Sequence, residues 1–354
     1  MNFQIGQIDK SRLGRVSTTL LFLLVLAVTL VKSGVGQKVP VVWDPATYPL
    51  PVSDRGQNSS YGLRTLGYVF GLDSQSTYLV ISIAVTIICV VLAAAAIIKS
   101  PWGSRSSRRI VMVVVLGGPF MWTVLREYHG IDPWVLGGSV VVASFAWGRV
   151  GLFVGLALML LGNPEQAFVA GVALLIATFM PSLRQWRKRA LLVLFTAFTV
   201  LVVLALWTAS LGDDSRLALI QSSAIEGGAY FVSWGLLGIY GGLGLIPLFA
   251  YVLWTGDRRF VSGLALVVAF LVPIAATMVT LDQSRVLVGT STLLGTAVTL
   301  RAVPSLLDWF ERHDLDGQVV TVVIVLLLPV VHVEYPSVIR PPLLIVSETL
   351  GGFL

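Results

Sequence analysis

The chain contains several uninterrupted apolar runs that approach or reach the thickness of a lipid bilayer. Examples are Val16 to Val31, Tyr78 to Ile98, Leu191 to Leu211 and Val261 to Leu281. A helix needs about 20 apolar residues to cross the hydrocarbon core. The runs show no alternation of period two, and backbone polar groups in lipid must be satisfied within the segment. The runs therefore predict membrane-spanning α-helices.

Composition excludes a soluble domain. Only 12% of the 354 residues are charged, 56% are hydrophobic and the mean hydropathy is +0.88, whereas soluble domains carry about 25% charged residues. The single cysteine, Cys89, lies within an apolar run and has no intrachain partner for a disulfide. We therefore predict an all-α, polytopic integral membrane helical bundle that occupies residues 1–354 as a single transmembrane domain.

The apolar pattern predicts about eleven transmembrane helices, with short or broken helices in the centre. The predicted spans are 13–32, 77–98, 110–126, 134–148, 149–162, 164–181, 190–211, 230–254, 260–281, 286–303 and 318–333.

Two regions leave the span count open. Arg149 and the Asn163-Pro164 pair interrupt the apolar run between Trp134 and Pro181. Three short helices would satisfy the charge pattern there, and so would one long span with a re-entrant pair. Residues 217–254 are also too long for one span, and we expect their first part, with Glu226, to lie along the outer interface or to re-enter.

Basic residues predict the orientation of the chain. Short loops rich in Lys and Arg mark the cytoplasmic side, and here they are 99–109, 184–189 and the Arg258-Arg259 pair. With a cytoplasmic N-terminus in the inner (plasma) membrane, twelve of the eighteen acidic residues fall on the outer face. The largest outer loop, 33–76, is then an extracytoplasmic segment that we expect to form a small cap.

The sharpest candidate site on the outer face is Asp282-Gln283-Ser284-Arg285. Asp282 and Arg285 are three residues apart, so on a helical turn they share a face and can pair. Asp and Ser also form turns, and a tight outer turn explains the same residues equally well.

A second candidate is the stretch from Arg126 to Asp132, which places a base, two acids and the imidazole of His129 within seven residues. The pKa of an unperturbed imidazole suits proton transfer, although ordinary interfacial solvation explains His129 equally well. A third candidate, Glu165, follows Pro164, and support of a helix N-terminus is its simpler interpretation.

Several familiar chemistries are disfavoured. The chain has no phosphate-cradling Walker sequence, no His-Glu-x-x-His site and no Cys cluster. The net charge of the chain is +6. Its basic residues lie in short loops, where they indicate the orientation of the chain in the membrane, so we expect no nucleic acid partner. No cofactor is assigned and a divalent metal stays open. Asp213 and Asp214 could share one only from a loop, because neighbouring residues point apart on a helix.

The layout resembles polyprenyl-linked membrane glycosyltransferases of the GT-C class and the bacterial polysaccharide polymerases. The resemblance rests on an acid after the first span, Asp44, on the Arg126 to Asp132 stretch after the third span, and on short central helices. The class often has an Asp-x-Asp or Glu-Asp pair in its first loop, but here Pro45 follows Asp44. The soluble C-terminal domain of many members is also missing.

The resemblance implies roles for four residues: Asp44, Arg126 and Asp132 match positions of the family, and Arg285 would contact phosphate by placement alone. Together with the candidates from the outer segments, the predicted catalytic carboxylates are Asp44, Asp132 and Asp282. The predicted substrate-binding residues are Arg126, His129, Glu165 and Arg285. The partners would be a lipid-linked sugar donor, a glycan or lipid acceptor and membrane lipid.

The sequence therefore predicts a transferase acting on the extracytoplasmic face with a polyprenyl-phosphate-linked sugar donor. A transporter or lipid flippase is the main alternative, because broken helices and an intramembrane Arg149 suit such proteins. A non-catalytic scaffold of an envelope-building complex is the second. The sequence does not fix the oligomeric state.

Overall fold

A computed structural model describes residues 17–33, 62–72, 74–127, 130, 132–210, 216–280, 283–313, 315–334 and 337–339 of the chain. Within these ranges the chain is helical apart from one short β-hairpin. The elements are α1 (Thr18–Ser33), α2 (Gly62–Phe70), α3 (Gln75–Ile98), α4 (Arg105–Leu116), α5 (Pro119–Arg126), α6 (Asp132–Ser144), α7 (Gly148–Gly162), α8 (Pro164–Ala177), the 3-10 helix η4 (Pro181–Trp186), α9 (Arg187–Ser210), α10 (Arg216–Leu243), α11 (Ile246–Asp257), α12 (Phe260–Met278), α13 (Gln283–Arg312), α14 (Gly317–Leu327), β1 (His332–Glu334) and β2 (Ser337–Ile339).

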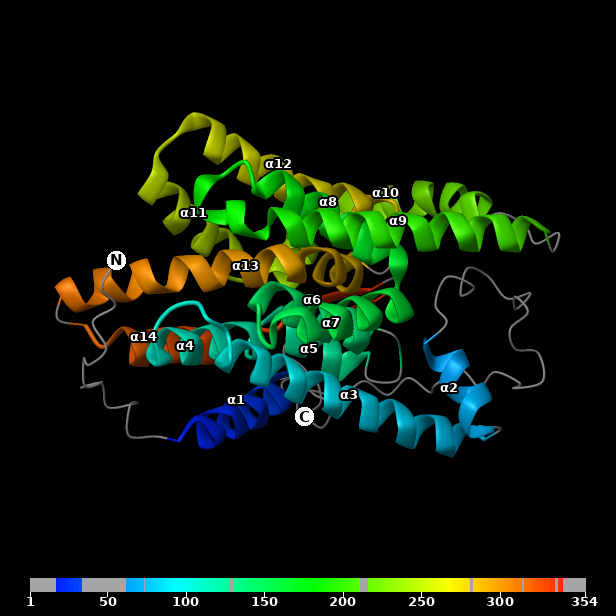
Figure 1. Ribbon diagram of the computed structural model, residues 1–354, viewed down its shortest axis with the longest axis horizontal. Helices are drawn as coiled ribbons and strands as arrows, with labels where there is room; N and C mark the ends of the chain where they lie inside the picture. Colours follow the sequence, from blue (N-terminus) through cyan, green and yellow to red (C-terminus); the bar gives the residue numbers. More distant parts are fainter. Residues whose placement is uncertain are drawn as a thin grey trace, which may run out of the picture.

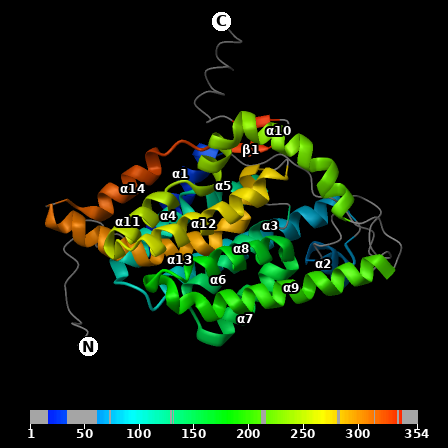
Figure 2. The ribbon, with the colours of Figure 1, turned by 90° about the horizontal axis from the view of Figure 1, so that it is seen from above.

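Helix α13 runs lengthwise through the middle of the bundle (Figure 1). It packs against α4, α5 and α6 on one side and against α8, α10, α11 and α12 on the other. In its most apolar 18-residue window, 89% of the residues are buried, whereas the corresponding figure for the span that contains α9 is 17%. Helix α13 is therefore an internal helix, and α9 lies at the edge of the bundle (Figure 2).

The burial of α13 is notable because this helix carries many hydroxyl groups. Four of these hydroxyl groups donate their hydrogens to carbonyls of the helix itself. The Oγ1 atoms of Thr290, Thr292 and Thr299 each donate to the carbonyl four residues earlier at 2.7 Å, and Ser291 does the same to Leu287 at 2.5 Å. Such bonds spare the cost of burying a hydroxyl group without a partner. Helix α13 is thus both polar in sequence and suited to the interior.

Four helices of the described ranges are long and apolar enough to cross a membrane, or six spans result if each of two bent pairs counts as one. The predicted count of about eleven is not confirmed. Predicted span 110–126 is broken between α4 and α5 with a bend of 43°, and predicted span 230–254 is broken between α10 and α11 with a bend of 69°. Pro119 and Pro247, at the starts of α5 and α11, explain the breaks because proline lacks the N–H that a continuing helix needs.

The central region, from residue 134 to 181, forms the three short helices α6, α7 and α8, and the choice between three short spans and one span with a re-entrant pair stays a prediction. A corner with left-handed backbone at Phe145 (φ 61°), Trp147 (φ 55°) and Gly148 (φ 57°) separates α6 from α7. The corner is held from α9, because Arg189 donates to the carbonyl of Val142 at 2.6 Å and its guanidinium lies 3.7 Å from the centre of the Phe145 ring.

Two other predicted segments differ from the structure. The predicted span 318–333 ends as a helix at Leu327, because Pro329 follows and the residue before a proline avoids helical backbone. The chain then forms β1, which pairs antiparallel with β2. In the predicted cap, 33–76, the structure describes α2 and the start of α3. Residues 34–61 lie outside the described ranges, so the cap stays a prediction.

Close packing of α6 on α7 depends on two glycines. A Cβ added at Gly138 would lie 2.5 Å from the Gly155 carbonyl oxygen, and one added at Gly155 would lie 2.9 Å from the Gly138 oxygen. Gly138 and Gly155 therefore allow the close approach of α6 and α7, since small residues let membrane helices pack closely.

We predict that Gly138→Ala lowers the free energy of unfolding by about 1–3 kcal/mol, because the methyl group would meet backbone that cannot move aside easily. Reversible unfolding in mixed micelles measures this change. Gly256→Ala is the matched control, because a Cβ at Gly256 in α11 meets open space and alanine favours a helix. Equal stability of the two variants would contradict the packing argument.

Candidate functional site

The candidate site begins at the turn that joins α5 to α6. Helix α5 ends at Arg126, and the N–H of Glu127 still donates to the Thr123 carbonyl at 2.8 Å. The N–H of Gly130 then donates to the Glu127 carbonyl at 2.9 Å, which reverses the chain. Helix α6 starts directly afterwards at Asp132. The turn therefore brings the side chains of Glu127 and Asp132 to the same end of the bundle.

The first turn of α13 lies against the α5–α6 turn and contacts three parts of the fold. Gln283 donates from Nε2 to the Gly227 carbonyl of α10 at 3.4 Å. Ser284 accepts, at Oγ, a hydrogen bond from the N–H of Val333 in β1 at 3.0 Å. Arg285 reaches the α5–α6 turn. Gln283 and Ser284 are fully buried, so the backbone that carries Arg285 is fixed by its two preceding neighbours.

Arg285 forms ion pairs with both acids of the turn. Its Nη1 lies 3.7 Å from Oε2 of Glu127, and its Nε lies 3.6 Å from Oδ1 of Asp132. The side chains of Glu127 and Asp132 are each 2% exposed, whereas that of Arg285 is 28% exposed. One guanidinium thus bridges two buried carboxylates and is itself the part of the cluster that solvent or a ligand can reach. We refer to Glu127, Asp132 and Arg285 as the acid–arginine cluster.

Helix ends add to the electrostatics of the cluster. Asp132 lies in the first turn of α6, where the positive end of the helix dipole stabilises a carboxylate. Arg285 lies in the first turn of α13, where the same dipole disfavours a cation. The two carboxylates offset that penalty. Removal of the guanidinium would leave two buried carboxylates without a cation, and removal of the carboxylates would leave the guanidinium without an anion. Either change is costly in a medium of low dielectric constant.

The remaining described site residues lie near the cluster. Arg126 is half-buried at the end of α5. Glu165 is half-buried in the first turn of α8, where the Asn163 side chain caps the N–H groups of Glu165 and Gln166 at 3.0 and 3.1 Å. Gln166 packs closely over Gly289, which lies one helical turn after Arg285. The start of α8 therefore lies beside the start of α13.

Three predicted site residues cannot be placed. Asp44, His129 and Asp282 lie outside the described residues. The predicted contact between Asp282 and Arg285 is therefore untested, and the ion pairs of Arg285 that the structure describes are those with Glu127 and Asp132. Asp132 and Arg285, separated by more than 150 residues in the chain, do come together.

Glu127 was not among the residues selected from the sequence. It belongs to the Arg126 to Asp132 stretch, but a family resemblance pointed to Arg126 and Asp132 alone. Its position in the sequence was informative: Glu127 follows Arg126 at the end of an apolar segment. An acid there is costly to bury and is therefore a candidate functional residue. In the described part of the chain, no group of three or more His, Cys, Asp or Glu side chains could hold a metal ion.

Comparison of the chain with protein-family models, with curated proteins and with solved structures found no match.

We predict that Arg285→Met destabilises the protein by about 3 kcal/mol, at the lower end of the range for breaking a buried ion pair, because Arg285 is partly exposed. Adding Glu127→Gln and Asp132→Asn in the same chain should restore much of that loss, since no uncompensated carboxylate then remains. Unfolding in mixed micelles of wild type, Arg285→Met, the Glu127→Gln/Asp132→Asn double variant and the triple variant gives the coupling between the sites. Additive effects of the three substitutions would show that the cluster is not coupled.

Proposed function

We propose that the protein is a membrane-embedded glycosyltransferase or polysaccharide polymerase that uses a polyprenyl-phosphate-linked sugar donor. The acid–arginine cluster carries this proposal. The chemistry requires a carboxylate that takes the proton of an acceptor hydroxyl and a cation that offsets the charge of the leaving phosphate. Glu127 and Asp132 supply the first and Arg285 supplies the second.

The cluster suggests how the two roles are linked. In the described geometry, Arg285 shares its charge between the two carboxylates. A donor phosphate that approaches the exposed guanidinium competes with them for it, because charge-assisted bonds from arginine to phosphate are strong and directional. A carboxylate released from Arg285 is then a better base for the acceptor hydroxyl. The bond from the sugar C1 to the phosphate oxygen breaks, the bond from C1 to the acceptor oxygen forms, and the acceptor proton passes to the carboxylate.

We further propose that the cluster faces the extracytoplasmic side of the inner membrane and that the N-terminus is cytoplasmic. Short helices such as α6, α7 and α8 would account for the spans beyond the four to six that length and composition identify. The charge distribution along the chain supports this orientation.

Orientation is testable at the two ends of α12. We predict that a cysteine in place of Thr280 reacts with a membrane-impermeant maleimide in intact cells, whereas one in place of Arg259 reacts only after lysis. The two positions flank the span Phe260–Met278, and Arg259 is largely exposed. The native Cys89 is buried and gives a low background. The reverse labelling pattern would place the cluster on the cytoplasmic side and remove the proposed donor from its reach.

The proposed activity is testable in cells without knowledge of the sugar. We predict that a strain lacking the protein loses a glycolipid or polysaccharide, detected by mass spectrometry, and that the wild-type chain restores it. Asp132→Asn and Arg285→Lys, at equal protein level in the membrane, should each lower the product by about 100-fold or more, the range for loss of a general base or an oriented charge.

The Asp257–Arg259 ion pair provides the matched control. It joins the same residue types at 3.4 Å, but Arg259 is 71% exposed. Asp257→Asn and Arg259→Lys should therefore leave the product unchanged. An unaltered glycolipid and polysaccharide profile in the strain without the protein would contradict the transferase proposal and leave the scaffold as the better interpretation.

A transporter is the second candidate, and one observation favours it. The two bent pairs touch, because a Cβ at Gly244 in the α10–α11 break would lie 2.9 Å from Cδ of Pro119 in the α4–α5 break. Transporters place substrate and ion sites at such broken helices. Ser284 and Leu287, which flank Arg285, lie against Gly241 and Gly242 at the end of α10. The acid–arginine cluster therefore lies close to the α10–α11 break.

A further inference from the structure

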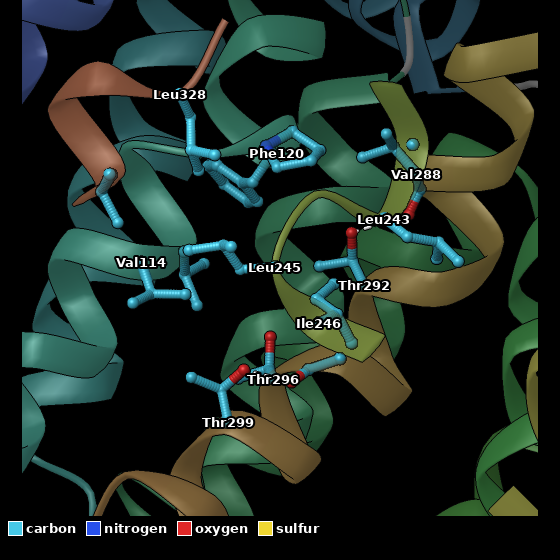
Figure 3. A pocket seen from close by; sticks show the side chains of 16 residues that line it. Val114, Phe120, Leu243, Leu245, Ile246, Val288, Thr292, Thr296, Thr299 and Leu328 are labelled. Atoms are coloured by element: carbon cyan, nitrogen blue, oxygen red, sulfur yellow. Dashed lines mark hydrogen bonds between the residues drawn. The ribbon is translucent and has the colours of Figure 1, made fainter. Parts of the chain in front are cut away.

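The cavity between the two helix breaks and α13 has a lining that is mainly apolar and uncharged, with three threonines on one wall (Figure 3). Such a lining does not select a charged ligand. Arginines without an acidic partner lie instead where α4 begins and α13 approaches its end. Arg301 follows Arg285 by sixteen residues on α13, or about 24 Å along the helix at a rise of 1.5 Å per residue.

Three aromatic rings gather at this end of the bundle. The ring of Trp102, in the α3–α4 loop, lies 5.3 Å from that of Trp186 in η4 and 5.5 Å from that of Phe145 after α6. The Phe145 and Trp186 rings are also 5.5 Å apart. The ring N–H of Trp186 donates to the Ala143 carbonyl at 2.8 Å. The ring N–H of Trp102 is buried and has no hydrogen-bond partner among the described atoms.

Two arginines border Trp102. The Arg301 guanidinium lies 5.9 Å from the centre of the Trp102 ring, and Nη1 of Arg108 donates to the Ser100 carbonyl in the same loop at 2.8 Å. Both arginines are half-buried, and their Nε atoms are buried without a hydrogen-bond partner among the described atoms. The ion pairs that the structure describes include neither arginine. The nearest acid along α13, the exposed Asp308, lies about 10 Å further on.

The surroundings add positive charge. Helix α4 has no acid in its first turn, and a helix N-terminus carries a partial positive charge. Arg189 lies over the Phe145 ring, and its described hydrogen bonds go to backbone carbonyls. Cations that lie close together in a medium of low dielectric constant repel one another, and a buried N–H without an acceptor is costly. A phosphate group offsets both costs, because it supplies negative charge and acceptor oxygens.

The neighbouring surface indicates that this phosphate belongs to a lipid. Helix α3 ends at Ile98, and the exposed Lys99 precedes the loop that carries Trp102. Acyl chains along the exposed face of α3 would place a headgroup beside this loop. Basic pockets between membrane helices bind anionic headgroups in this way. The exposed face is marked by apolar side chains at helical spacing, namely Val80, Ile83, Ile87 and Val91.

We propose that Trp102, Arg108 and Arg301 form a binding site for the phosphate of an anionic phospholipid whose acyl chains lie along α3. The two guanidinium groups and the indole N–H donate to the phosphate oxygens, and the bound lipid holds the α3–α4 loop against α13. This site is separate from the acid–arginine cluster, and it does not depend on the transferase proposal.

Thermal unfolding of the purified full-length protein in detergent tests the proposal. The midpoint is measured with increasing dioleoyl phosphatidylglycerol, dioleoyl phosphatidylcholine or inorganic phosphate at equal ionic strength. A ligand that binds only the folded state raises the midpoint with increasing concentration. We expect such an increase with phosphatidylglycerol and a much smaller one with phosphatidylcholine, whose choline group adds a cation. Arg301→Gln should weaken the apparent affinity for phosphatidylglycerol by about 5-fold, the contribution of one basic residue near an anionic lipid.

Arg312→Gln is the matched control, because it makes the same charge change at the exposed end of the same helix, where Nε of Arg312 donates to the Asp308 carbonyl. It should keep the full response. If Arg301→Gln does not fold, retention of phosphatidylglycerol in native mass spectrometry is compared between wild type and Arg108→Gln, which should retain less.

Three results would overturn the proposal. The first is an equal increase with the two phospholipids, and the second is an equal loss of affinity in Arg301→Gln and Arg312→Gln. The third is an increase with inorganic phosphate as large as that with phosphatidylglycerol, which would show that the site takes a free anion and not a lipid.

Discussion

Burial of a polar helix is the constraint on which the rest of this structure depends. Helix α13 is the most enclosed of the candidate spans, yet it is also the least apolar of them. Four of its hydroxyl groups bond back to its own carbonyls, and Gln283, Ser284 and Arg285 have partners on neighbouring elements. Helix α10, strand β1 and the α5–α6 turn are therefore positioned by specific polar contacts with α13 as well as by apolar packing, which alone is weakly directional in lipid.

The candidate site follows from the same constraint at the start of α13. Gln283, Ser284 and Arg285 are consecutive and contact α10, β1 and the α5–α6 turn in that order. The first two contacts leave Arg285 little freedom, so its guanidinium is oriented before any ligand arrives. Such preorganisation is what makes a charged group effective in stabilising a developing charge.

The sequence predicted the helical membrane class well, because hydropathy and the requirement for internal backbone hydrogen bonds decide it locally. It also selected Asp132 and Arg285, since an acid or base at the end of an apolar segment stands out. It could not predict that they meet, because that contact depends on how α6 packs on α13. The spacing of Asp282 and Arg285 predicted a local ion pair instead. Glu127 was not selected as a site residue.

The breaks in the helices were only partly predictable. Proline at 119 and 247 disfavours a continuous helix, but hydropathy continues across both positions, so each pair was assigned as one span. The contact between the two breaks, through Gly244 and Pro119, arises from tertiary packing and has no signature in a single sequence.

The central claim is that Arg285 receives the phosphate of a polyprenyl-linked donor. The most direct measurement is the retention of added polyprenyl phosphate by the purified protein, detected by native mass spectrometry, for wild type, Arg285→Lys and Arg259→Lys. We expect wild type and Arg259→Lys to retain the lipid phosphate and Arg285→Lys to lose most of it, because lysine cannot reproduce the bidentate geometry of a guanidinium. Equal retention by all three proteins would contradict the claim.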